Sequence, residues 1–251
     1  MDIRLNAATF RSTFLFSRLI FLLLSACFSL QAFSWENNNS TLYIDPNLIK
    51  PNIFLPPPPP ADSLETNREI ILIKNVMSNI SRDQKMLAKS DALTKNVSFF
   101  ADVIPNFDID KLPITKAVFE SIRYNENYEV KVFKKYFSRK RPTQIDDKIK
   151  PCVGADAEDL FESYPSGHTT MAYSMGIILA NLIPEKANQI MERSRKYANN
   201  RVFCGAHFPS DVVAGQVLGS LVALSMLENS LFKIRLEESK QELIRFGFTV
   251  N

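Results

Sequence analysis

Residues 212–227 read VVAGQVLGSLVALSML and form the most apolar stretch of the chain after its first 34 residues. The stretch contains polar side chains such as Gln216, and it is shorter than the roughly 20 apolar residues that a membrane-spanning helix needs. We therefore expect a helix that is buried inside a helical bundle. Gly215 and Gly219 lie about one helical turn apart and would let a second helix approach closely.

The remainder of the chain shows the same helical period. Only 7 of the 251 residues are glycine, and 45% are hydrophobic, enough for one substantial core. Apolar residues recur at three- and four-residue steps, whereas strand-like alternation is scarce. The predicted fold class is therefore all-α, a compact single-domain helical bundle over residues 61–251. We predict helices near residues 62–79, 81–97, 111–138, 167–182, 184–202, 209–228 and 229–245, the first of them capped by Asp62.

Two segments precede this domain. Residues 1–34 combine three arginines, an apolar run over residues 19–30 and small residues ending at Ser34, the pattern of a secretory signal peptide. The protein is then periplasmic or secreted, with cleavage near Ser34; a lipoprotein-like box ending at Cys27 offers lipid anchoring as the alternative. Residues 35–60 end in five prolines, which favour an extended arm packed on the surface or at a subunit contact.

Removal of residues 1–34 leaves two cysteines, Cys152 and Cys204. An even number of cysteines in an oxidising compartment favours one disulfide, although two separate buried thiols remain the alternative. The same removal lowers the net charge from +3 to +1, so no general charge excess for binding a nucleic-acid polymer is present. Any basic cluster therefore needs a local explanation.

The two histidines of the chain lie in unusual clusters, YPSGH at residues 164–168 and RVFCGAHFPSD at residues 201–211. In the second cluster, Asp211 follows His207 by four residues, so its carboxylate can accept a hydrogen bond from one imidazole nitrogen. The other nitrogen then presents its lone pair outward, as a nucleophile requires. Arg201 can hold phosphate oxygens through two parallel hydrogen bonds.

The first cluster and a basic run supply further anion-binding groups. Ser166 or Gly167 should open a helix beside His168, and a helix N-terminus offers unpaired N–H groups to a phosphate. Lys134 and Arg141 are seven residues apart, which would place them on nearly one helical face with Arg141 at the helix end. Alone, such a run is typical of a solvated face; together the three clusters indicate phosphate chemistry.

These motifs, Lys-x6-Arg-Pro, Pro-Ser-Gly-His and Arg-x5-His-x3-Asp, resemble the three-part signature of the type 2 phosphatidic acid phosphatase (PAP2) superfamily, which includes the vanadium haloperoxidases. The signal peptide, the proline arm, SYPSGHTT and CGAH are similar to class A bacterial non-specific acid phosphatases. One departure is Asn200, where the family usually has serine, and it puts one supporting hydrogen bond in doubt.

The resemblance implies an acid phosphatase that hydrolyses small phosphomonoesters without a metal or other cofactor. It makes His207 the nucleophile that forms a phosphohistidine, Asp211 the group that fixes its tautomer, and His168 the acid that protonates the leaving group. This chemistry favours an acidic optimum, because the leaving-group acid must be protonated while His207 stays neutral, and the resemblance together with the proline arm suggests a homodimer. The residues that would surround the phosphate are Lys134, Arg141, Ser166, Gly167 and Arg201.

Three alternative activities would use the same phosphate-binding site, and a metal site is a rival interpretation of the same residues. An apyrase-like enzyme for nucleoside di- and triphosphates, or a lipid-phosphate phosphatase, would share the phosphohistidine chemistry. A vanadate-dependent haloperoxidase would bind vanadate in the same oxyanion pocket. A rival zinc site would combine His168, His207, Asp211 and Cys204 but would leave the arginines without a purpose.

Overall fold

The apolar stretch lies in helix α9 (Pro209–Glu228), which is part of a helical bundle, as predicted. Helix α9 packs most extensively against α7 (Gly167–Leu182). In this computed structural model, the described residues are 40–154 and 160–250, which belong to one unit, Asn39–Asn251. The predicted signal peptide and Cys27 lie outside the described residues. No strand occurs in the described part of the chain, so the all-α prediction is confirmed.

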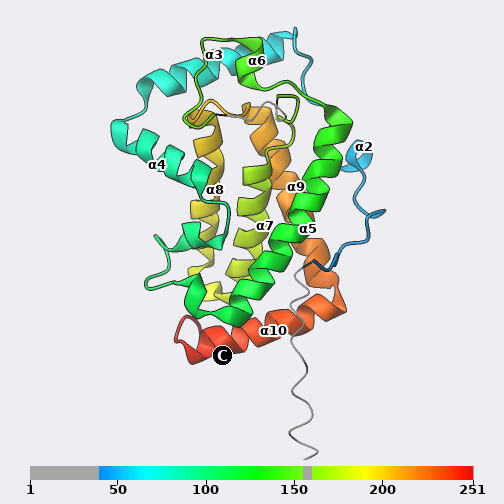
Figure 1. Cartoon of the computed structure of the whole chain (residues 1–251), viewed down its shortest axis with the longest axis vertical. Coiled ribbons are helices and arrows are strands. Elements are labelled where there is room, and N and C mark those ends of the chain that lie inside the picture. The colour runs from blue at the N-terminus through cyan, green and yellow to red at the C-terminus, as the bar shows by residue number, and fades with distance from the viewer. Residues whose placement is uncertain (1–39, 155–159, 251) are drawn as a thin grey trace, which may run out of the picture. The chain divides into compact units, whose positions relative to one another are not determined.

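Three further long helices complete the bundle: α5 (Pro113–Phe137), α8 (Ala187–Phe203) and α10 (Ser230–Arg245). Figure 1 shows α5, α7, α8 and α9 side by side, with α10 crossing the end of the bundle near the C-terminus. Helices α3 (Leu64–Asn79) and α4 (Arg82–Leu93) pack against α8. The most deeply buried side chains of α7, including Met175, Ile178 and Leu179, lie in the main apolar core.

The two glycines of α9 bring it close to α7, as predicted. A Cβ atom at position 215 would lie 2.7 Å from the Ser166 carbonyl oxygen, and one at position 219 would lie 2.5 Å from the Thr170 carbonyl oxygen. Both contacts are with backbone atoms, which cannot move aside as a flexible side chain could. By length and composition alone α9 could cross a membrane, but half of its most apolar window is buried inside the bundle.

Most helix boundaries follow the prediction, and the differences have local causes. Ser63 caps α3 by accepting a hydrogen bond from the Thr66 amide, so Asp62 is not the cap. Helix α4 ends at Leu93, earlier than residue 97, because the chain becomes extended at Thr94 and then forms a short 3₁₀ turn. Another 3₁₀ turn occupies residues 184–186, so α8 begins at Ala187.

The proline-rich segment lies against the bundle. One helical turn, α2 (Pro51–Phe54), interrupts the segment that the sequence predicts to be extended, and Leu55 after it is buried in the main core. The Tyr164 hydroxyl donates a 2.8 Å hydrogen bond to the Pro56 carbonyl. The arm is thereby attached beside the YPSGH cluster.

Candidate active site

A cavity of about 300 Å³ lies at one end of the bundle, lined by α5, the start of α7, the end of α8 and the loop that leads into α9. Figure 1 shows the end of α5, the start of α7, the end of α8 and the start of α9 at the same end, opposite α10. The sequence-predicted site residues that line the cavity are Lys134, Arg141, Gly167, His168, Arg201 and His207. The three sequence clusters therefore come together in space.

Arg141 reaches the cavity by a route that differs from the prediction. Helix α5 ends at Phe137 and is closed by Ser138 in the left-handed conformation, so Arg141 lies in the following loop, directly before the short helix α6 (Pro142–Ile145). The prediction that Lys134 and Arg141 share one helical face is therefore wrong, although both residues line the cavity. The loop turns Arg141 back, and its guanidinium donates to the Ala206 carbonyl at 3.2 Å.

His207 has the orientation that a nucleophilic imidazole needs. Its Nδ1 atom lies 3.3 Å from the Asp211 carboxylate, and its Nε2 atom lies 3.3 Å from Nη1 of Arg141. A proton on Nδ1, shared with the carboxylate, leaves the lone pair on Nε2, which faces the guanidinium. Burial chiefly lowers the pKa of His207 to about 3, with Arg141 and Arg201 also lowering it and Asp211 opposing them.

Asp211 is itself held by groups that the sequence analysis did not assign to the site. Its carboxylate accepts hydrogen bonds from Arg139 Nη1 at 2.6 Å, from the Ser163 hydroxyl at 2.6 Å and from the Phe208 amide at 2.9 Å. Burial raises the pKa of this carboxyl, but the hydrogen bonds from His207 and Ser163 and the charge of Arg139 outweigh burial, so the pKa lies below its usual value. Asp211 is therefore a fixed anion behind His207.

Arg139 connects this carboxylate to helix α3. Its Nη2 donates to Glu69 at 2.9 Å, its Nη1 also donates to Ser210 at 2.7 Å, and its guanidinium lies 4.0 Å above the ring of Phe208. In the sequence, Arg139 is one cation of a basic run, and nothing there distinguishes it from its solvated neighbours. Its burial depends on a tertiary contact with an element 70 residues away.

Arg201 carries a buried charge that the described protein does not fully satisfy. The residue is 5% exposed, and its Nε and Nη1 atoms are buried without a hydrogen-bond partner among residues 40–154 and 160–250. Burial lowers the pKa of the guanidinium to about 10, which leaves it charged at any working pH. A buried cation with unused donors on the wall of a cavity is suited to an anion.

His168 stands at the start of α7 and is half-buried. Its Nε2 atom lies 3.1 Å from the Ala92 carbonyl, an acceptor, so Nε2 carries a proton and donates it. Burial, Arg201 and His207 lower the pKa of His168 well below its ordinary value. The imidazole is therefore neutral at mild pH until a bound anion compensates the neighbouring cations.

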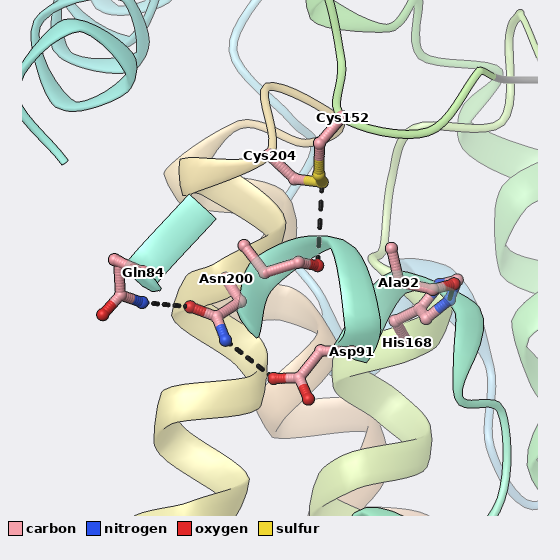
Figure 2. Close-up of a disulfide and its surroundings, with 8 residues drawn as sticks. Gln84, Asp91, Ala92, Cys152, His168, Asn200 and Cys204 are labelled. Atoms are coloured by element: carbon pink, nitrogen blue, oxygen red, sulfur yellow. Dashed lines mark hydrogen bonds between the residues drawn. A yellow bond between two sulfur atoms is a disulfide. The ribbon is translucent and has the colours of Figure 1, made fainter. Parts of the chain in front are cut away.

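The end of α4 that presents Ala92 is clamped to α8. Asp91 accepts two hydrogen bonds from Arg193, at 3.0 and 2.6 Å, and one from Asn200 at 2.7 Å. Gln84 donates to Asn200 at 2.7 Å, and Figure 2 shows Asn200 between Gln84 and Asp91. Asn200, the departure from the family pattern, therefore joins α8 to two turns of α4.

Ser166 is placed differently from the other predicted phosphate ligands. It caps α7, accepting from the Thr169 amide at 3.4 Å and from the Thr169 hydroxyl at 3.0 Å, and it is fully buried. It is not among the described residues that line the cavity. Its amide donates to the Asp211 carbonyl at 3.0 Å, which couples the start of α7 to the start of α9.

A disulfide joins Cys152 to Cys204, whose Cα atoms lie 5.0 Å apart (Figure 2). The Cys152 amide also donates to the Cys204 carbonyl at 3.0 Å. Pro151 and Val153, on either side of Cys152, line the cavity. The bond therefore fixes one wall of the cavity to the end of α8, just after Arg201, and makes Cys204 unavailable as a thiolate ligand for zinc.

Two additional cations line the cavity and were missed by the sequence analysis: Lys95, in the loop after α4, and Arg123, on α5. No carboxylate is among the lining residues that the structure describes. Within the described ranges, no group of three or more His, Cys, Asp or Glu side chains is arranged to hold a metal ion. The cavity is strongly cationic.

Comparison with known proteins agrees with this geometry. The PAP2 superfamily model matches residues 120–234. The chain is 31% identical over 199 residues to an acid phosphatase of Zymomonas mobilis, covering 77% of this chain and 75% of that protein. It is 27% identical over 201 residues to a non-specific acid phosphatase of Salmonella typhi, covering 75% and 80%.

A shorter match links the chain to a lipid A 1-phosphatase of Rhizobium johnstonii, 33% identical over 97 residues, 37% of this chain and 38% of that protein. The matched family region contains Lys134, Arg141, His168, Arg201 and His207. The convergence of these residues on one cavity and the long match to acid phosphatases lead to one conclusion. The chain belongs to the PAP2 superfamily.

Proposed function

We propose that the protein is an acid phosphatase that hydrolyses phosphate monoesters through a phosphohistidine at His207. The observation that carries the proposal is the buried guanidinium of Arg201, with two unused donors on the wall of a cavity that also holds His207. A tetrahedral oxyanion would accept from these donors and balance the charges of Lys134 and Arg141. The names of the relatives support the same activity.

In the first step, Nε2 of His207 attacks phosphorus while the bond from phosphorus to the leaving oxygen breaks. Asp211 keeps the proton on Nδ1 and stabilises the imidazole as it gains positive charge. Lys134, Arg141 and Arg201 surround the equatorial oxygens, where the charge of the transition state is spread. His168 donates a proton to the departing oxygen, so that an alcohol leaves.

In the second step, water attacks the phosphohistidine, His168 accepts a proton from it, and His207 and inorganic phosphate are released. Burial, and after it the cations around His168, lower the pKa of His168 in the free protein. A bound phosphate compensates these cations and raises the pKa of His168, which lets it carry the proton that the leaving group needs. In the free protein the pKa of His207 is about 3, so the nucleophile is neutral when it meets a substrate in mildly acidic solution.

Export through residues 1–34, a homodimer and independence of metal ions belong to the same proposal. They are supported by the composition of the N-terminal segment, by the resemblance and by the cationic character of the cavity. A lipid-phosphate substrate is the second candidate, because the shorter match is to a lipid A 1-phosphatase. The two candidates differ in the leaving group and share the phosphohistidine.

The test is a mixing experiment with a ³²P-labelled aryl phosphate, quenched in alkali, in which a phosphohistidine survives. We expect label on the wild-type chain and on His168→Ala, which should accumulate the intermediate, but none on His207→Ala. Full hydrolysis by His207→Ala would overturn the proposal. Activity that is lost in EDTA and restored by a metal ion would overturn metal independence.

A further inference from the structure

We propose that Lys95 and Arg123 form a subsite for a second anionic group, carried by the leaving group of the substrate. The inference rests on the proposed phosphatase function and names the class of substrate: phosphomonoesters whose alcohol portion bears a carboxylate or a further phosphate. Both cations line the cavity that contains His207, and neither is needed to hold the transferred phosphoryl group.

One face of α5 runs along the cavity wall. Its lining residues are Arg123, Asn127, Val130 and Lys134, spaced by four, three and four residues, which places them on a single helical face. Eleven residues separate Arg123 from Lys134, about 16 Å along the helix axis. The wall therefore has a cation at the phosphoryl end and another at the far end, with an amide and an apolar side chain between them.

Lys95 lies on the cavity wall near His168. It follows Ala92, whose carbonyl contacts His168, by three residues, and its charge contributes to lowering the pKa of His168. Because the Ala92 carbonyl holds Nε2 of His168, Nδ1 is the nitrogen that would serve the leaving oxygen, and we place Lys95 at the leaving-group end because it shares the cavity and its charge acts on this imidazole. Lys95 is exposed, so its ammonium can reach an anionic substituent at the cavity mouth.

Arg123 contributes oriented hydrogen-bond donors rather than net positive charge. It forms an ion pair with Glu126, which is fully buried and holds one edge of the guanidinium. Glu126 cancels the charge of Arg123, but the planar fork keeps donors on its other edge. Lys95 then provides the net positive charge, and Arg123 provides hydrogen bonds. The cavity volume of about 300 Å³ fits a small substrate, such as a phosphorylated sugar acid.

The matched substrates are 6-phospho-D-gluconate and D-glucitol 6-phosphate, which share an open six-carbon chain and one scissile phosphate and differ in a terminal carboxylate. We expect wild type to favour the gluconate by about three- to tenfold in kcat/KM, mostly through KM, as for a partly exposed charge pair with one hydrogen bond. The preference should decrease as salt screens the charges.

Lys95→Gln should reduce this preference, measured as the ratio of kcat/KM for the gluconate to kcat/KM for the glucitol ester in the same variant, because any effect of Lys95 on the pKa of His168 acts on both esters alike. Lys89→Gln is the control, since Lys89 is an exposed lysine of α4 outside the cavity lining and the variant has the same net charge. The pair Arg123→Gln with Glu126→Gln removes the second cation without leaving a buried carboxylate unpaired, and it should also reduce the preference.

The outcomes separate this inference from the proposed function. If wild type hydrolyses both esters equally, or if its preference persists unchanged in Lys95→Gln, the subsite is wrong and the phosphatase remains. If Lys89→Gln removes the preference as well, the effect is one of overall charge and the subsite is also wrong. If wild type hydrolyses neither ester nor an aryl phosphate, the proposed function itself fails.

Discussion

Arg139 and Lys140 are neighbours in the sequence with opposite environments. Arg139 is buried against Asp211 and Glu69, whereas Lys140 is exposed. The Arg139 side chain determines where the carboxylate behind His207 lies, although it is absent from the residues lining the cavity. At the scale of single residues, the orientation of the His207 imidazole therefore depends on a cation that does not line the cavity.

Replacing Arg139 should reduce turnover more than it affects folding. Arg139→Lys keeps the charge but loses the planar fork that bonds Asp211, Ser210 and Glu69 together. We expect kcat/KM to fall by about 10- to 100-fold, because a small displacement of a nucleophile has effects of this size. Lys140→Gln is the control and should retain wild-type rates. An Arg139→Lys protein with unchanged kcat/KM would contradict the positioning role.

Stability should depend on pH through His207. Its pKa is about 3 in the folded protein and about 6.5 in an unfolded chain, so between these values the unfolded state binds the proton more tightly. The free energy of unfolding should therefore decrease as pH is lowered from about 6.5, by up to about 1.4 kcal/mol per pH unit for this group. Urea denaturation of wild type and of His207→Gln at pH 4 to 7 measures this pH dependence of the free energy of unfolding. Parallel pH profiles would refute this attribution.

Elements differ in how far local sequence determines their position. Helices α7 and α9 begin where the sequence predicts, because Ser166 and Pro209 act on adjacent backbone. No feature of the sequence predicts that the Ala92 carbonyl contacts His168, because every residue has a backbone carbonyl and only the tertiary structure shows which one a side chain reaches. The position of Arg141 also depends on tertiary structure, because a loop rather than helical spacing brings its side chain to the cavity. Local chemistry predicts helix starts, and tertiary packing decides which side chains support them.

The glycines of α9 provide a test at this scale. A Gly→Ala change in a helix interior normally stabilises by about 1 kcal/mol. Gly219→Ala should instead destabilise, because the new methyl would press on the Thr170 carbonyl and on Tyr173. Ser220→Ala, one residue further, gains helix propensity without such a contact and serves as control. Thermal melting compares them, and a Gly219→Ala midpoint at or above wild type would contradict the close approach.

At the scale of the whole molecule, the disulfide joins two segments 52 residues apart. For a loop of this length, the chain-entropy model gives about 4 kcal/mol of stabilisation, obtained by restricting the unfolded chain. We expect reductant to lower the urea midpoint of wild type and to have no effect on the Cys152→Ser, Cys204→Ser double variant. Equal midpoints for wild type with and without reductant would show that the bond contributes little.

The convergence of four helix ends opposite α10 also has a practical consequence (Figure 1). After α10, at the end far from the cavity, Phe248 still packs on the main core and Thr249 is buried, and the side chain of Val250 is exposed. A tether attached at residue 250 would therefore hold the protein on a support with its cavity facing the solution. Immobilised on a resin in this way, the protein should process dissolved esters without obstruction by its own support.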